Sequence, residues 1–209
     1  MEHYLDEIVN YLSSENLNLV ATSHDGRVNS IANEDQIINL LKNKYSNSVD
    51  IPNIRSWYDF GLRKDNQEIY INIKVSDLDN GAADNLSSKI GMGYALTGIK
   101  DLPVDWHSFN EILANNLKYG YDYYFLIVNK NDTSDIFWTS LKRIKELRSN
   151  GSNLPFQCDW GKNREPSGRS EYEAIKYILS VYVDSWDKKT NGYPEKIKNM
   201  LSNGMIIGN

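Results

Sequence analysis

The feature that most constrains the fold of this chain is a pair of strand-like segments, residues 57–63 and 68–74, separated by four polar residues. In the second segment Ile69, Ile71 and Ile73 alternate with polar side chains. Alternation with a period of two is typical of a strand that buries one face and leaves the other polar. We therefore expect a β-hairpin whose isoleucines point into a hydrophobic core.

The turn of this hairpin fixes which residues face one another. If Asp65 and Asn66 are its two central residues, Asp59 lies directly opposite Asn72. Directly opposed residues project from the same face of a sheet, with Cβ atoms roughly 4.5–5.5 Å apart. Lys74, two positions further along, shares that face. The sequence thus predicts that an acid, an amide and a lysine meet on the polar side of the hairpin, provided that the register does not slip by one residue.

Hydrophobic spacing and turn signals predict the remaining elements. Helices are expected over 4–14, from Asn33, from a cap at Asp84 to about Leu96, over 108–117, in the basic stretch after 141, and from a Ser170–Glu173 capping box; strands are expected at 18–23 and 27–31 around an Asp25–Gly26 turn, at 121–128 and at 136–141. This order indicates an α/β (α+β) fold, a central mixed β-sheet flanked by helices, in a single domain spanning 1–209.

Composition excludes several classes of protein. The net charge is −5 and the pI is about 5.3, which argues against a polybasic nucleic-acid binder. The single cysteine, Cys158, excludes an internal disulfide framework and a multi-cysteine zinc site. The longest apolar run, 123–128, is far shorter than a membrane span, and the acidic start is unlike a signal peptide. We expect a cytoplasmic protein with no membrane partner.

The predicted cluster suits phosphodiester hydrolysis. Carboxylates bind Mg²⁺, which polarises a phosphoryl oxygen, and a nearby lysine can orient or deprotonate the attacking water. Glu34 is the candidate for a third acid, because it stands three and four residues before Ile37 and Ile38 and so turns toward the buried side of its helix. Asp59 and Asn72 are the candidate metal ligands, Lys74 the candidate for the water, and Glu34 the outer acid.

Asp59-Phe60, eleven intervening residues and Asn72-Ile73-Lys74 together resemble the PD-(D/E)xK motif of type II restriction endonucleases. The resemblance covers roughly residues 1–100, and the stretch 153–157 is similar to a recognition loop of such enzymes. It implies a restriction-endonuclease-like fold, Mg²⁺ as cofactor, and cleavage of double-stranded DNA at a short palindromic site to give 5′-phosphate and 3′-hydroxyl ends. It also implies a homodimer and a cognate DNA methyltransferase in the same restriction-modification system.

Asn72 departs from the motif, which has Asp or Glu at that position. An amide oxygen can coordinate a hard cation but brings no negative charge. Three explanations are open: Glu34 or Glu68 supplies the missing charge, the protein has lost catalysis naturally, or Asn72 replaces a native acid in an inactivated form. The third is slightly favoured.

Charge is distributed unevenly along the chain, so the negative net charge does not exclude a nucleic acid as partner. Residues 142–169 hold seven basic and three acidic residues, a net charge of +4, which leaves −9 for the rest. A basic segment that contains a polar loop suits phosphate contacts and hydrogen bonds to base edges. We interpret 142–169 as the DNA-recognition segment. The candidate DNA-binding residues are Asn80, Asn85, Ser87, Ser88, Lys89, Asn153, Gln157, Lys162, Asn163, Arg164 and Arg169.

Simpler interpretations stay open. Asp59 and Lys74 would also form a cross-strand ion pair on a surface, Glu34 would complement a helix dipole, and residues 142–148 would make an ordinary solvated helix face. The alternative functions are a non-catalytic DNA-binding or interaction module on a degenerate nuclease fold, or another nuclease of this fold such as a resolvase or a repair nickase.

Overall fold

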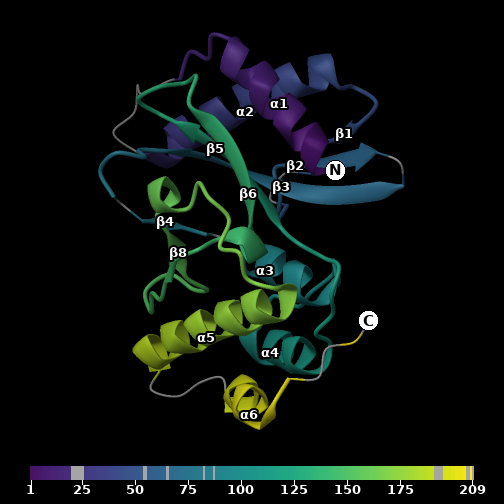
Figure 1. Ribbon diagram of the computed structural model, residues 1–209, viewed down its shortest axis with the longest axis vertical. Coiled ribbons are helices and arrows are strands. Elements are labelled where there is room, and N and C mark those ends of the chain that lie inside the picture. Colours follow the sequence, from purple (N-terminus) through teal and green to yellow (C-terminus); the bar gives the residue numbers. More distant parts are fainter. Residues whose placement is uncertain are drawn as a thin grey trace. The chain divides into compact units, whose positions relative to one another are not determined.

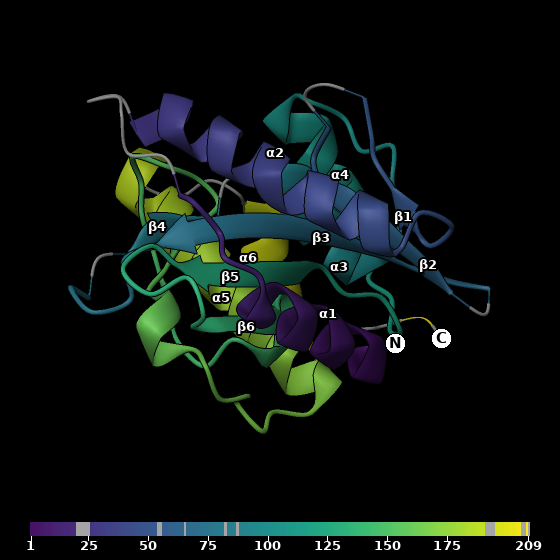
Figure 2. The same ribbon diagram turned by 90° about the horizontal axis from the view of Figure 1, so that it is seen from above.

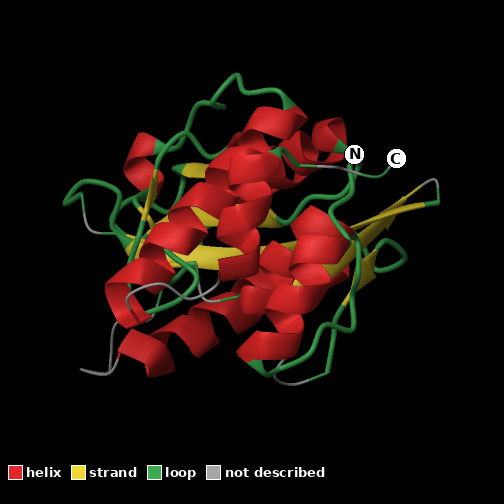
Figure 3. Cartoon of the chain, turned by 90° about the horizontal axis from the view of Figure 1, so that it is seen from below, coloured by secondary structure: helices red, strands yellow, loops and turns green. Residues whose placement is uncertain are grey.

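A computed structural model describes residues 1–19, 26–53, 56–64, 66–81, 83–86, 88–190, 195–205 and 208. The chain divides into two compact units. The first, here the sheet unit, comprises Met1–Ala82 and Tyr124–Thr139, and the second, here the helical unit, comprises Ala83–Tyr123 and Ser140–Asn209. The hairpin with the candidate catalytic residues belongs to the sheet unit, and the recognition segment 142–169 belongs to the helical unit. Helices, strands and loops are coloured in Figure 3.

The sheet unit is built on one mixed sheet with the strand order β1-β2-β3-β5-β6. Its elements are α1 (Glu2–Ser14), α2 (Gly26–Lys44), β1 (Val49–Asp50), β2 (Phe60–Lys64), β3 (Gln67–Ser76), β5 (Tyr124–Asn129) and β6 (Ile136–Ser140). β1 pairs with β2 and β2 with β3 in antiparallel fashion, whereas β3 and β5 are parallel. Helices α1 and α2 lie on the same side of the sheet (Figure 1), and α2 runs along β3 (Figure 2).

The hairpin register is the one predicted from the sequence. Phe60 pairs with Ile71 and Leu62 with Ile69, so the residues of each pair are related by a turn centred between 65 and 66. Asn66 has a φ of +63°, a left-handed conformation that asparagine tolerates better than most residues. The predicted opposition of Asp59 and Asn72 lies one position beyond the last pair of the two strands, Phe60 and Ile71.

The isoleucine face of β3 forms the centre of the core of the sheet unit. Ile71 and Ile73 are completely or almost completely buried, together with side chains from both helices and from the neighbouring strands. The contributing helical residues follow the spacing of an amphipathic helix: Leu5, Ile8 and Leu12 on α1 and Ile37 and Leu41 on α2. The prediction from the period-two pattern, that the isoleucines of this strand point into a hydrophobic core, is therefore confirmed.

The helical unit contains a second, three-stranded sheet of order β4-β8-β7. Its elements are β4 (Asp84–Asn85), α3 (Lys89–Thr97), α4 (Trp106–Asn115), a 3₁₀ turn η1 (Leu141–Arg143), β7 (Leu147–Arg148), β8 (Gln157–Cys158), a second 3₁₀ turn η2 (Trp160–Lys162), α5 (Glu171–Thr190) and α6 (Glu195–Asn203). Ser88 caps α3 by accepting from the N–H of Gly91, and Asp105 caps α4 by accepting from that of Ser108. The Ser170–Glu173 capping box is present at α5.

Three sequence predictions of secondary structure are wrong. Residues 27–31 belong to helix α2 rather than to a strand, whereas 20–25, including Asp25, lie outside the described residues. Asp84 lies in strand β4, and the helix assigned to it begins only at Lys89, where Ser88 provides the cap. The basic stretch after 141 forms a single 3₁₀ turn and then strand β7.

The helix predicted for the basic stretch is prevented by tertiary hydrogen bonds. The backbone N–H groups of Lys145 and Glu146 donate to the side-chain oxygen of Asn163, and the N–H of Leu147 donates to the Tyr177 hydroxyl. These N–H groups are thus committed to distant side chains and not to the carbonyls of a preceding helical turn. Such partners cannot be read from local spacing.

At the level of fold class the prediction is confirmed: this is a mixed α/β structure with a five-stranded mixed sheet flanked by helices. Among the described residues, no helix has both the length and the apolar character that a membrane crossing requires.

Candidate active site

Asp59 is held at the entrance of strand β2 by two contacts with β3. Its backbone N–H donates to the carbonyl of Ile71 at 2.9 Å, and its carboxylate Oδ2 accepts from the backbone N–H of Ile73 at 2.6 Å. Asp59 therefore contacts β3 on either side of Asn72, through its backbone at Ile71 and through its carboxylate at Ile73. This contact fixes the carboxylate against the backbone of the strand that carries Asn72 and Lys74.

The electrostatic surroundings of Asp59 connect it with two of the other predicted residues. The pKa of Asp59 is raised to about 6, mainly by burial and to a smaller extent by the negative charge of Glu34. The hydrogen bond from Ile73 and the positive charge of Lys74 act in the opposite direction. Glu34 and Lys74 are thus close enough to Asp59 to act on its charge.

Asn72 contributes the feature that distinguishes this cluster. Its side-chain oxygen Oδ1 is inaccessible to solvent and has no hydrogen-bond partner among the described residues. A buried acceptor left in this way costs roughly 1–3 kcal/mol relative to a satisfied one. An uncompensated oxygen next to a carboxylate with a raised pKa is the environment in which a bound cation or a bound donor would be stabilising.

Three aromatic rings pack together in the hairpin that carries Asp59, and these were not singled out from the sequence. Tyr70 shares the polar face of β3 with Asn72, and its ring centroid lies 4.8 Å from that of Trp57 and 4.7 Å from that of Tyr58. The Tyr70 hydroxyl donates to Glu68, which also pairs with Arg63 at 2.7 Å. Period-two alternation already placed Tyr70 on this face, so its position was available from the sequence. Glu68 is engaged by Tyr70 and Arg63.

The donor set suits a hard cation but is short of charge. Asp59 and Glu34 supply two carboxylates, and Asn72 supplies a neutral oxygen; these are ligand types that Mg²⁺ accepts. Within the described part of the chain, no group of three or more histidine, cysteine, aspartate or glutamate side chains could hold a metal ion. With Asn72 as the third oxygen donor, the ligand types are those of Mg²⁺, but the set carries one negative charge fewer than an acid at position 72 would provide.

Three of the predicted DNA-binding residues have structural contacts in the helical unit. Ser88 is the buried cap of α3, and Lys89 donates to the carbonyls of Pro103 and Val104 while lying over the Trp106 ring. Arg169 donates to two backbone carbonyls at 2.9 Å and its guanidinium lies 3.7 Å from the centroid of the Tyr177 ring. These side chains stabilise the unit in the conformation described.

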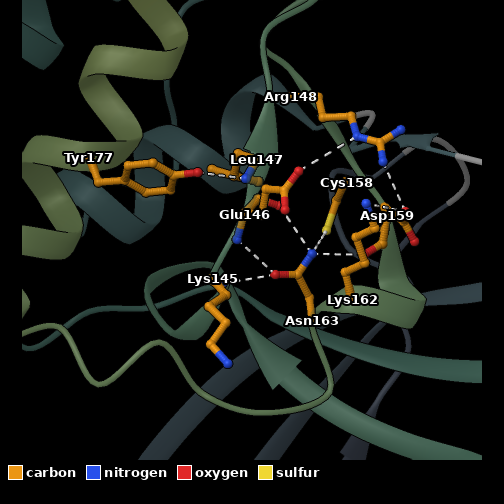
Figure 4. A network of polar contacts seen from close by, with 9 residues as sticks. All are labelled: Lys145, Glu146, Leu147, Arg148, Cys158, Asp159, Lys162, Asn163 and Tyr177. Carbon is orange, nitrogen blue, oxygen red and sulfur yellow. Dashed lines mark hydrogen bonds and ion pairs between the residues drawn. The ribbon is translucent and has the colours of Figure 1, made fainter. Parts of the chain in front are cut away.

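Asn163 is the clearest departure from the predicted role of base reader. It is completely buried, and both side-chain atoms are fully used (Figure 4). Its oxygen accepts from two backbone N–H groups at 2.9 Å each, and its nitrogen contacts the carbonyls of Glu146 and Asp159 and the sulfur of Cys158. Asn163 therefore joins the segments around 146 and 158 and does not face solvent.

Apart from Ser87, the other predicted DNA-binding residues are at least partly accessible. Asn80 belongs to the sheet unit, Ser87 lies outside the described residues, and the rest belong to the helical unit: Asn85, Asn153, Gln157, Lys162 and Arg164. Gln157 donates through Nε2 to the Asn85 oxygen at 3.0 Å. Sequence reasoning named both members of this pair but did not predict their contact.

Comparison of the chain with models of known protein families gives no match, and comparison with curated proteins gives none either.

Proposed function

We propose that this chain is a Mg²⁺-dependent deoxyribonuclease of the type II restriction class, with its cleavage centre at Asp59, Asn72, Lys74 and Glu34. The observation that carries the proposal is the buried, unpartnered Oδ1 of Asn72, which lies on the same strand whose backbone binds the Asp59 carboxylate. A purely structural hairpin gains nothing from an uncompensated acceptor at this point. A cation site gains a ligand.

Each residue has a distinct part in this proposal. Asp59, Asn72 and Glu34 would hold Mg²⁺, which when bound polarises the phosphodiester and lowers the pKa of a water molecule. Lys74 orients the attacking water, accepts its proton or offsets the charge that develops on phosphorus. The raised pKa of Asp59 means that it accepts a proton below about pH 6, which would compete with a cation for the same oxygens.

Asn72 limits the activity of the chain as it stands. Replacing a carboxylate by an amide removes one negative charge from the donor set, and each ~1.4 kcal/mol of lost transition-state stabilisation is a tenfold loss in rate. We interpret Asn72 as standing in the position of a catalytic acid. Binding of DNA does not require that acid, and the loss of one negative charge reduces repulsion of the phosphate backbone.

The proposed substrate is double-stranded DNA with a short palindromic site, cut to 5′-phosphate and 3′-hydroxyl ends. A palindrome requires two equivalent subunits, so the proposed assembly is a homodimer in which each copy cuts one strand. A cognate methyltransferase that protects the same site belongs to such a system.

The decisive assay is digestion of plasmid and bacteriophage DNA with Mg²⁺ by the unsubstituted chain with Asn72, called the natural chain only for brevity, and by Asn72→Asp. We expect discrete, reproducible fragments from Asn72→Asp, at a rate at least roughly 100-fold above that of the natural chain. Asn72→Asp combined with Asp59→Asn is the matched control and should be inactive. No cleavage by Asn72→Asp would contradict the proposal.

One observation favours a second candidate. Because Asn72 is uncharged, the chain could bind DNA without cutting it, as a non-catalytic module on a nuclease-like scaffold. The same assay distinguishes the candidates: nicking or smearing of the plasmid by Asn72→Asp indicates another kind of nuclease, such as a resolvase or repair enzyme. DNA binding without cleavage by either chain indicates the module.

A further inference from the structure

One row of side chains crosses all three strands of the small sheet in the helical unit. Asn85 on β4 pairs with Gln157 on β8, and Gln157 pairs on its other side with Arg148 on β7. Directly opposed residues in antiparallel strands project to the same face. Asn85, Gln157 and Arg148 therefore form a continuous row, here called the amide row.

The neighbouring row shows which face of this small sheet is covered. Asp84, Cys158 and Leu147 are the next opposed residues, and they project to the other face. Cys158 is completely buried and Leu147 is 6% exposed, so this face packs into the unit. In the amide row, Asn85 is exposed, Gln157 is half-buried, and the side chain of Arg148 is 38% exposed. The accessible face of the sheet is thus the polar one.

The two amides of the row hold each other in a defined orientation. Gln157 Nε2 donates to Asn85 Oδ1 at 3.0 Å. Within the described part of the chain, neither side chain makes a further hydrogen bond. The pair therefore presents one acceptor, Gln157 Oε1, and several N–H donors, the two of Asn85 Nδ2 and the second of Gln157 Nε2, side by side.

The supporting structure restrains this pair. The N–H of Leu86 donates to the carbonyl of Phe156, which continues the pairing of β4 with β8. Behind β8, the buried amide of Asn163 contacts Cys158 Sγ at 3.3 Å. Arg148 is paired with Asp159 at 3.0 Å, so its positive charge is fixed beside Gln157. A pre-ordered pair loses little conformational entropy on binding.

We infer that the amide row reads base edges in the major groove of duplex DNA, with the Asn85–Gln157 pair selecting adenine. This inference rests on the proposed function for its ligand, double-stranded DNA. In the major groove adenine offers the N7 acceptor next to the N6 amino donor, and an amide donor and acceptor together complete both hydrogen bonds. Guanine offers two acceptors, which would leave Gln157 Oε1 unpaired in a desolvated site.

The test is selection of bound sequences from a pool of random duplexes in Ca²⁺ buffer, with the natural chain and Gln157→Glu. We expect the natural chain to enrich a short site that contains adenine at a symmetric pair of positions. Gln157→Glu should replace that adenine by cytosine, whose N4 amino group donates to a carboxylate. Gln157→Ala should lose roughly 10- to 100-fold in affinity for the natural site and much less for a site without that adenine.

Lys162→Ala is the matched control, because Lys162 is 55% exposed and lies 4.0 Å from Asp159, outside the row. It should weaken binding to all duplexes alike and reduce the salt dependence, as expected for a phosphate contact. Equal thermal unfolding midpoints of the natural chain and Gln157→Glu establish that the variant folds.

An unchanged base preference in Gln157→Glu, or a uniform loss of affinity in Gln157→Ala, would overturn the inference. Enrichment of no sequence by the natural chain would overturn it too. Those outcomes leave cleavage by Asn72→Asp unaffected, so the proposed function would stand. Failure of every variant to bind any duplex would overturn both.

Discussion

Two buried polar clusters in this protein, one in each unit, are organised in opposite ways. Around Asn163 each amide atom has protein partners, and the carboxylate of Asp159 nearby is paired with Arg148. Around Asp59 the carboxylate has a raised pKa, a second acid acts on it, and the Asn72 oxygen has no partner among the described residues. Both clusters contain an asparagine near an aspartate. Only the first is complete without a ligand.

This difference indicates which cluster contributes to folding and which to binding. Buried polar groups that stabilise a fold have their hydrogen bonds satisfied, because an unsatisfied one costs more than it returns. A site that binds a cation needs oxygen acceptors that have no hydrogen-bond partner in the protein. Such acceptors lower the stability of the unliganded state. Substitutions in the two clusters should therefore have opposite consequences for stability and activity.

The largest expected effect is on cleavage. In the Asn72→Asp background, Lys74→Met should reduce the rate of DNA cleavage by roughly 10³-fold or more, because a group that acts on the attacking water is removed. Single-turnover cleavage of plasmid DNA measures this loss. Lys176→Met, which replaces an exposed lysine of α5, is the control and should leave the rate unchanged. Equal rates for the two lysine variants would refute the role of Lys74.

The next largest effect distinguishes the two asparagines by stability. Asn163→Ala should lower the free energy of unfolding by about 3–4 kcal/mol, because it leaves two buried backbone N–H groups without an acceptor and removes a buried amide. Asn72→Leu should change it by less than about 1 kcal/mol or increase it, since an unsatisfied acceptor is replaced by an apolar group of similar size. Urea denaturation without metal measures both. A larger loss of unfolding free energy in Asn72→Leu than in Asn163→Ala would contradict the assignment of Asn163 to folding and Asn72 to binding.

A smaller effect follows from the raised pKa of Asp59. A carboxyl whose pKa rises on folding, here from 3.8 to about 6, makes the folded state relatively more stable at low pH and less stable above pH 6. Asp59→Asn should therefore increase the free energy of unfolding at pH 8 by on the order of 1–3 kcal/mol, with no gain below pH 4.

The measurement for Asp59→Asn is urea denaturation at both pH values in the presence of a chelator. The pKa of Asp122 is also raised to about 6, mainly by burial. Because Asp122 is present in both proteins, its contribution to the pH dependence cancels in the difference between them. A gain of equal size at pH 4 and pH 8 would show that the titration of Asp59 is not its cause.

The smallest predicted effect concerns the partner of strand β7. Tyr177→Phe removes the hydroxyl that accepts from the N–H of Leu147 at 2.7 Å. We expect a loss of about 1 kcal/mol in the free energy of unfolding. Hydrogen exchange at the Leu147 amide should become faster in the variant. An unchanged exchange rate would mean that this hydroxyl does not hold β7 in place.

The hairpin and its cluster could be predicted because the information is local. Alternation fixes the faces of β3, a two-residue turn fixes the register, and these two facts bring Asp59 to Asn72. The helical spacing of Ile37 and Ile38 singled out Glu34, whose negative charge acts on Asp59 in the structure. Period two and period 3.6 are both properties of a short stretch of sequence.

The recognition segment could not be predicted in the same way, because distant residues determine its structure. Lys145 and Glu146 are kept from a helix by Asn163, and Leu147 by Tyr177, thirty positions away. A polar, basic loop composition also does not distinguish a buried amide such as Asn163 from an accessible one such as Asn85. Pairing across β4, β8 and β7 makes that distinction, and it depends on the tertiary structure.

The central claim is that the incomplete cluster is a cation site, and calorimetric titration with Mg²⁺ tests it most directly. Asn72→Asp should bind Mg²⁺ at least roughly tenfold more tightly than the natural chain, because it adds a negative ligand, and Asn72→Leu and Asp59→Asn should bind much more weakly. Identical titration curves for all four proteins would contradict the account.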